Sequence, residues 1–107
     1  MKHMINKARL TEFSEKVYAI CSKIPKGKVM TYGQIAKILK SSPRAVGQAL
    51  KHNPYAPKIP CHRVIKSDGT LGGFNGKMHS MKKIKLLRSE GVEVEDFRID
   101  ERFIKSD

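Results

Sequence analysis

The sequence predicts a mainly α-helical domain with a small β-hairpin, arranged as a winged helix-turn-helix. Apolar residues recur at helical spacing in several stretches, and two of the shorter stretches are joined by a polar turn at positions 40–42. A short alternating stretch with a turn signal comes later and predicts the wing. The chain has 107 residues, of which 39% are hydrophobic, so it is long enough for one modest core.

The first helix is expected to begin at Thr11. Threonine is a good N-cap, and Glu12 and Glu15 fall in the first turn, where the helix dipole favours carboxylates. A proline and a glycine then end the helix. Residues 1–10 show no clear periodicity, so we expect them to form a flexible basic lead-in.

The second and third helices carry clear start signals. Thr31 is expected to cap a helix over residues 32–40, and Ser42 is expected to cap the next helix, which has proline at its first position. A helix pair without any ligand would share this pattern. Small outer residues, Ala45 and Gly47, favour DNA binding, because they would let the third helix lie close to a groove.

A wing and a last helix are expected after the helix pair. Residues 63–66 alternate as a strand, a turn follows at 67–69, and Thr70 begins the return strand of a hairpin. The last helix is expected to run from its cap, Ser80, to Glu90.

The net charge of +12 is unevenly placed. Residues 1–91 hold 19 basic and 4 acidic residues, or +15, whereas residues 92–107 hold 3 basic and 6 acidic ones, or −3. A body this basic attracts polyanions, among which nucleic acid is the commonest in cells; an anionic membrane surface or a plain lysine-rich surface is the alternative. The expected division is a lead-in at 1–10, a domain at 11–91 and an acidic tail at 92–107. The tail is expected to solvate itself or fold back, as a loosely packed strand or short helix.

Several classes of protein are disfavoured by the sequence. No apolar run approaches the ~20 residues of a membrane span, so no membrane partner is expected and the expected location is cytoplasmic, or nuclear in a eukaryote. Cys21 and Cys61 lie far apart without zinc-ligand spacing, so no metal site is expected. Cys21 lies beside the apolar face of the first helix and is expected to pack there.

A thiol, an imidazole and a guanidinium follow one another in the stretch Pro60-Cys61-His62-Arg63-Val64. A cysteine is an effective nucleophile only as its thiolate, and that form needs a nearby base or positive field. The alternative is a core cysteine beside a surface histidine. Glu90 stands at a helix C-terminus, where the dipole disfavours a carboxylate. This placement suggests a local partner, with His62 and Arg63 as candidates.

Five ordered blocks resemble the O6-alkylguanine-DNA alkyltransferase family. The stretch around Cys61 resembles its active-site signature. The other blocks are Tyr32-Gly33-Gln34-Ile35-Ala36, Arg44-Ala45-Val46-Gly47, Asn53-Pro54 and Leu86-Leu87-Arg88-Ser89-Glu90-Gly91. The resemblance covers residues 13–91 and implies the winged helix-turn-helix of the family's C-terminal domain.

The resemblance also implies roles at the site. Cys61 would take an alkyl group from guanine O6, His62 would act as base through a bridging water, and Glu90 would orient the imidazole. A bridging water also suits an extended backbone, in which neighbours point to opposite faces. Asn53 would brace the turn after the recognition helix. No cofactor is implied, and each molecule would react once, because water does not cleave the thioether product.

Further implied residues contact DNA or line the substrate pocket. Arg44 would enter the base stack and Tyr32 would press on a phosphate as the alkylated guanine swings out. The remaining ones are DNA contacts at Ala45, Gly47 and Arg63 and pocket residues at Gly73, Phe74, Asn75 and Lys83. By composition alone, Lys83 belongs to the wet face of the last helix. The implied partner is duplex DNA containing O6-alkylguanine, bound by a monomer, with other repair proteins as further candidates.

A non-catalytic function is the runner-up. Single-domain relatives called alkyltransferase-like proteins bind alkylated guanine and recruit other repair factors. They carry tryptophan or alanine at the cysteine position, so Cys61 favours catalysis. A plain winged-helix regulator would leave Cys61, His62 and Glu90 without a reason for their placement. Two departures from the family are Phe74, where many members have tyrosine, and a shorter turn before Arg44.

Overall fold

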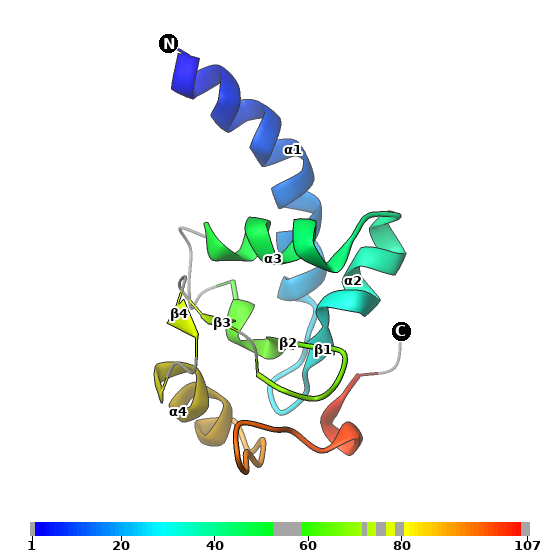
Figure 1. Ribbon diagram of the computed structural model, residues 1–107, viewed down its shortest axis with the longest axis vertical. Helices are drawn as coiled ribbons and strands as arrows, with labels where there is room; N and C mark the ends of the chain where they lie inside the picture. The colour runs from blue at the N-terminus through cyan, green and yellow to red at the C-terminus, as the bar shows by residue number, and fades with distance from the viewer. Residues whose placement is uncertain (1, 53–58, 72, 75–76, 79–80, 106–107) are drawn as a thin grey trace.

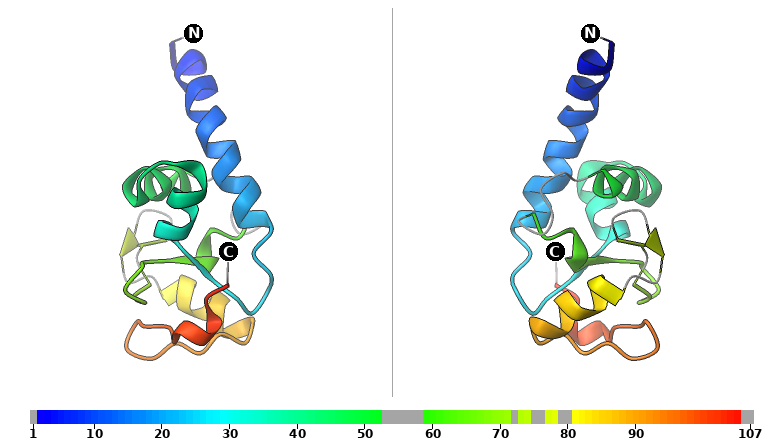
Figure 2. Two further views of the ribbon diagram at one scale, coloured as in Figure 1. Left: turned by 90° about the vertical axis from the view of Figure 1, so that its right-hand side faces the viewer. Right: turned by 90° about the vertical axis from the view of Figure 1, so that its left-hand side faces the viewer.

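The computed structural model describes residues 2–52, 59–71, 73–74, 77–78 and 81–105. Its elements, with η for a 3-10 helix, are α1 Lys2–Ser22, β1 Met30–Thr31, α2 Tyr32–Leu39, α3 Pro43–Lys51, η1 Cys61–Arg63, β2 Val64–Ile65, β3 Gly73–Phe74, β4 Lys77–Met78, α4 Met81–Ser89 and η2 Glu101–Phe103. Helix α1 projects from the body, with α2 and α3 beside its C-terminal half and α4 toward the opposite end (Figures 1 and 2). The mainly helical architecture agrees with the prediction.

The expected start of the first helix at Thr11 is wrong, because α1 begins at Lys2. Residues 2–10 contain neither glycine nor proline and include lysine, methionine, alanine, arginine and leucine, which are good helix formers, so nothing stops the helix from extending toward the N-terminus. The C-terminal half of α1 contributes Val17 and Cys21 to the core, and Ile24, just beyond the helix, joins them.

The helix pair forms as predicted. Thr31 and Gln34 make a capping box: Gln34 N–H donates to Thr31 Oγ1 at 3.0 Å, and Thr31 N–H donates to Gln34 Oε1 at 2.8 Å. Ser42 Oγ accepts from the N–H of Ala45 at 3.1 Å and so caps α3. Tyr18 Oη donates to the carbonyl of Ala49 at 2.8 Å, which fastens α3 to α1.

The strand after Cys61 pairs differently from the prediction. β2 lies parallel to β1, with Met30 opposite Val64 and Thr31 opposite Ile65. Val64 and Ile65 are both fully buried, and they face two different hydrophobic clusters. An exposed hairpin could not bury two consecutive apolar residues on opposite faces, whereas a strand inside the body can. The antiparallel hairpin is instead β3–β4.

The C-terminal segment folds back onto the body, which was one of the two alternatives predicted for the tail. A short 3-10 helix, η2, forms there, but the packing is not loose. Val92, Val94 and Ile99 are buried in one cluster with Ile84 and Leu87 of α4. The segment therefore belongs to the second hydrophobic core.

Backbone pairing reinforces this packing. The predicted return strand at Thr70 pairs with Arg98 of the C-terminal segment. Leu71 N–H donates to the carbonyl of Phe97 at 3.1 Å, and Ile99 N–H donates to the carbonyl of Gly69 at 2.9 Å. The predicted turn at 67–69 does close, because Lys66 N–H donates to the carbonyl of Thr70 at 2.8 Å, while Val64 and Ile65 pair with β1 instead. Among the described residues, no helix combines the length and apolar character of a membrane span.

Ile99→Ala should destabilise the protein by about 2–4 kcal/mol, because it empties a buried position in the second cluster. Ile38→Ala removes the same atoms from a side chain that is 48% exposed, and it is the matched control. Urea unfolding of the three proteins measures the difference. Equal losses for the two variants would contradict the packing of the C-terminal segment.

Candidate active site

Cys61 and His62 lie in a tight turn rather than in the extended segment that was expected. Pro60 has φ −80° and ψ 67°, the conformation of an inverse γ-turn, and Cys61 N–H donates to the carbonyl of Ile59 at 2.8 Å. The proline ring fixes φ near this value, so the turn is built into the sequence. The 3-10 helix η1 follows at once. Cys61 is 4% exposed and His62 is 2% exposed.

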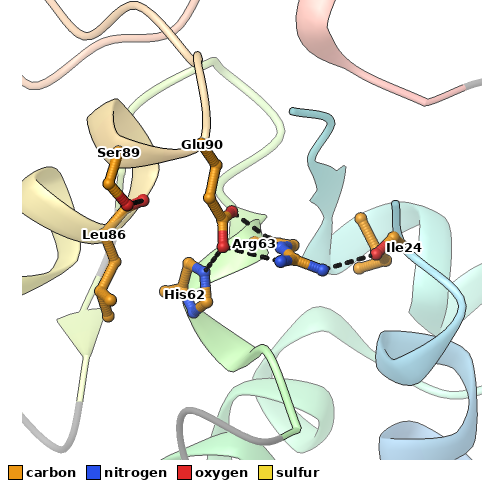
Figure 3. A network of polar contacts seen from close by, with 6 residues as sticks. All are labelled: Ile24, His62, Arg63, Leu86, Ser89 and Glu90. Atoms are coloured by element: carbon orange, nitrogen blue, oxygen red, sulfur yellow. Dashed lines mark hydrogen bonds and ion pairs between the residues drawn. The ribbon is translucent and has the colours of Figure 1, made fainter. Parts of the chain in front are cut away.

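Glu90 follows the end of α4 and binds both residues that were named as its candidate partners (Figure 3). Its Oε2 lies 3.0 Å from Nε2 of His62. Arg63 donates from Nε to Oε1 at 2.8 Å and from Nη2 to Oε2 at 2.7 Å, a two-pronged ion pair. A third donor of Arg63, Nη1, binds the carbonyl of Ile24 beyond the end of α1 at 2.8 Å.

The ionisation of this network follows from burial and from these contacts. Burial alone would raise the pKa of Glu90, but hydrogen bonds from Arg63 and His62 hold the pKa below its usual value. Burial lowers the pKa of His62, the hydrogen bond and charge of Glu90 oppose this, and the positive charges of Arg63 and Lys83 add to the lowering. At neutral pH, therefore, Glu90 is a carboxylate and His62 is a neutral imidazole.

The assignment of Lys83 to the wet face of the last helix is wrong, because its side chain is fully buried. Nζ donates to the carbonyl of Val64 at 2.7 Å and to that of Leu71 at 2.6 Å. Burial lowers the pKa of Lys83 to about 7, and only the negative charge of Cys61 works against that. The protonated form of Lys83 therefore interacts favourably with the thiolate form of Cys61.

Tyr32 and Cys21 share the surroundings of Cys61. The Tyr32 ring centroid lies 6.0 Å from Lys83 Nζ. Burial, together with the negative charges of Cys61 and Cys21, raises the pKa of Tyr32 to about 12. The same two causes, burial first and then Cys61, raise the pKa of Cys21 to about 12. Cys21 is fully buried and is a thiol at neutral pH, which agrees with the expected packing role.

The residues predicted to contact DNA on α3 lie on the accessible side of that helix, whose other side is buried. Arg44 is exposed at the second position of α3, and Ala45 is partly exposed. A Cβ built on Gly47 would meet no atom within 4 Å, so this face of the helix is open. Arg63 differs, because its guanidinium is turned into the protein. Its contact with DNA remains a prediction that these hydrogen bonds do not favour.

Other predicted residues are only partly described or not described. Gly73 and Phe74 form β3, of which the structure describes only the backbone. Asn53 and Asn75 lie outside the described residues. The described residues contain no cluster of three histidine, cysteine or acidic side chains that could hold a metal ion.

Three backbone carbonyls at the site were missed by sequence reasoning. Those of Val64 and Leu71 hold Lys83, and that of Ile24 holds Arg63. Every residue has a carbonyl, so the sequence carries no direct signal for such roles. A lysine at an apolar position of α4 is the one available hint.

Lys83→Met should remove a pH dependence of stability. The pKa of Lys83 is about 7 in the folded protein against 10.5 for an ordinary lysine, so between these values the unfolded chain binds more protons. Stability of the wild type should therefore rise from pH 7 to pH 9 relative to the variant, by up to about 1.4 kcal/mol per pH unit. Urea unfolding at pH 7, 8 and 9 measures this, with exposed Lys82→Met as the control. Parallel curves of stability against pH for wild type and Lys83→Met would contradict the lowered pKa of Lys83.

Comparison with known proteins places the chain in a family. Residues 12–92 match the family model described as 6-O-methylguanine DNA methyltransferase, DNA binding domain. The methylated-DNA–protein-cysteine methyltransferase of Methanothermobacter thermautotrophicus is 44% identical over 85 residues, covering 79% of this chain and 47% of that protein. The enzyme of the same name from Thermococcus sibiricus is 48% identical over 84 residues, covering 78% and 46%. The chain thus spans about half the length of these curated relatives.

Two solved structures illustrate the fold. Atl1 of S. pombe, in complex with damaged DNA containing O6-carboxymethylguanine, superposes with a TM-score of 0.81 at 34% identity, covering 90% of this chain and 96% of that one. The O6-methylguanine-DNA methyltransferase of Pyrococcus kodakaraensis superposes with a TM-score of 0.66 at 46% identity, covering 75% and 46%. These likenesses confirm the predicted fold class. Because the family model matches residues 12–92, well over half of the chain, the chain belongs to the family of the 6-O-methylguanine DNA methyltransferase DNA-binding domain.

Proposed function

We propose that the protein repairs O6-alkylguanine in duplex DNA by moving the alkyl group to Cys61, once per molecule. The observation that carries the proposal is the buried thiol of Cys61 beside the hydrogen-bonded pair of His62 and Glu90, with Lys83 interacting with its charge. A buried cysteine that served packing alone would need neither an imidazole nor a buried ammonium. The names of the relatives support the same reaction.

The chemistry is a displacement at carbon. His62 takes the thiol proton through a bridging water, and the thiolate of Cys61 attacks the alkyl carbon. The carbon–sulfur bond forms as the carbon–O6 bond breaks, and the electron pair leaves with guanine, which takes up one proton. The buried ammonium of Lys83 stabilises the thiolate before the attack. No cofactor takes part, and the thioether persists.

Reaction at O6 requires the guanine to leave the base stack, because that atom is buried in the duplex. We place α3 in the groove, where Arg44 would enter the stack and the open face at Ala45 and Gly47 would approach the DNA. Tyr32 would contact the phosphate of the flipped nucleotide. Residues Asn53, Gly73, Phe74 and Asn75 keep their expected roles in the turn and the pocket. The protein would act inside the cell, as a monomer.

A second candidate is recognition of alkylated guanine without repair, followed by recruitment of other repair proteins. It is favoured by the likeness to Atl1, which this chain covers almost completely. The presence of Cys61 argues for the first proposal.

Incubation with a duplex containing one O6-methylguanine should add a single methyl group, ~14 Da, to the intact protein. Cys61→Ala should gain no mass, and Cys21→Ala, which alters the other buried thiol, should gain the same mass as wild type. Intact-mass spectrometry measures all three. No gain in wild type, with tight binding to the lesion, would shift the conclusion to the second candidate. No gain and no preference for the lesion would exclude both.

Gly47→Glu should weaken binding to duplex DNA, because it places a negative side chain on the open face of α3. Gln48→Glu adds a charge at the next position on the same helix and is the matched control. Gly47→Ala should fold normally and bind as wild type does, since its Cβ meets no other atom. Titration of a labelled duplex measures the affinities. Equal affinities for the two glutamate variants would place the DNA elsewhere.

A further inference from the structure

The guanidinium of Arg63 is hydrogen-bonded to groups inside the protein. Its side chain is 15% exposed, and three of its nitrogens donate to two oxygens of Glu90 and to the carbonyl of Ile24 (Figure 3). A guanidinium that serves phosphate binding would instead present its fork to solvent. These hydrogen bonds therefore indicate a role within the site for Arg63, rather than the DNA contact that the resemblance implied.

The fork determines how Glu90 meets His62. Both carboxylate oxygens are engaged by Arg63, so the carboxylate plane cannot rotate independently of the guanidinium. Oε2 accepts from Arg63 and also lies within hydrogen-bond distance of His62 Nε2. Arg63 thus fixes the position of the Glu90 oxygen that the imidazole of His62 contacts.

The ion pair between Arg63 and Glu90 also affects the protonation of His62. A buried carboxylate beside a histidine favours the protonated imidazolium, because opposite charges stabilise each other. An imidazolium has no lone pair and cannot accept a proton. Arg63 is permanently charged and balances Glu90, so a proton added to His62 would leave an excess positive charge near buried Lys83. The neutral imidazole is the form that this arrangement retains.

The hydrogen bond to Glu90 then selects one tautomer. A carboxylate accepts and cannot donate, so the proton of the neutral ring lies on Nε2 and the lone pair lies on Nδ1. Nδ1 is the atom that can take up a proton.

We propose that Arg63 is a positioning residue for alkyl transfer, which fixes Glu90 and balances its charge so that His62 remains a neutral imidazole with its lone pair on Nδ1. The proposal rests on the function proposed above, in which His62 is the base for Cys61. Charged neighbours of His62 are Glu90, Arg63 and Lys83. Cys61 precedes it in η1, and Cys21 of α1 and Tyr32 of α2 share the surroundings of Cys61.

NMR titration of the imidazole in DNA-free protein tests the proposal directly. The His62 signal is assigned by its loss in His62→Gln. In Arg63→Gln, which removes the charge, the imidazole should take up its proton at higher pH than in wild type. Arg102→Gln removes an arginine from an exposed ion pair with Glu93 and should leave the titration unchanged. Superimposable curves for Arg63→Gln and wild type would overturn the proposal, and this readout requires no reaction with DNA.

Single-turnover kinetics with an O6-methylguanine duplex supply the functional readout. For Arg63→Gln the acid limb of the transfer rate should move up by roughly one pH unit, while duplex affinity stays within about twofold of wild type. A rate loss that is uniform over pH would reduce Arg63 to a purely structural role. A loss of duplex affinity without a shift of the acid limb would instead show that Arg63 contacts DNA. Absence of transfer in wild type would refute the proposed function, and the titration would still show whether Arg63 keeps His62 neutral.

Arg63→Lys covers the case in which Arg63→Gln does not fold. Lysine keeps the charge but cannot hold both oxygens of Glu90, so transfer should slow severalfold while the acid limb keeps its position. A wild-type rate for Arg63→Lys would show that the fork is not needed. Far-UV circular dichroism confirms that the variants compared are folded.

Discussion

The partly buried carboxylate of Glu90 is the constraint on which the rest of the site depends. It follows the C-terminal end of α4, where the helix dipole repels negative charge, and only 9% of its side chain is exposed. Such a group is tolerable only when donors surround it, and η1 supplies them through His62 and Arg63. Because Arg63 also binds the carbonyl of Ile24, one carboxylate ties α4, the thiol-bearing turn and the chain leaving α1 together.

Lys83 imposes a related constraint on the second core. It lies seven residues before Glu90, so α4 and the residue that follows it bring two ionisable groups toward the same region. Its ammonium is held by the carbonyls of Val64, the first residue of β2, and of Leu71. The N–H of Leu71 is bound in turn by Phe97 of the C-terminal segment. The acidic segment therefore holds the residue whose carbonyl binds the lysine.

Local chemistry in the sequence predicted the helix pair well. Caps at Thr31 and Ser42 act within a few residues, and the structure confirms both. The misplaced charge of Glu90 also led to its partners, because a dipole effect can be read from position alone. The pairing of β2 with β1 could not be predicted in this way. The paired residues lie 34 positions apart in the chain, and their register depends on which faces of the strands are buried. Burial of Lys83 was hidden for a similar reason: a lysine gives the same local signal whether its neighbours are water or carbonyls.

Both thiols of the chain are buried, and this has a practical consequence. Cys21 is fully shielded and Cys61 is 4% exposed, so a bulky thiol reagent reaches either one only when the core opens. Their rates of modification would report separately on the opening of the packed helix and of the turn that follows Pro60. After full denaturation, a molecule that has accepted an alkyl group would titrate as having one thiol instead of two. The thiol content of a sample would thus record the fraction of molecules already consumed, without any label on the DNA.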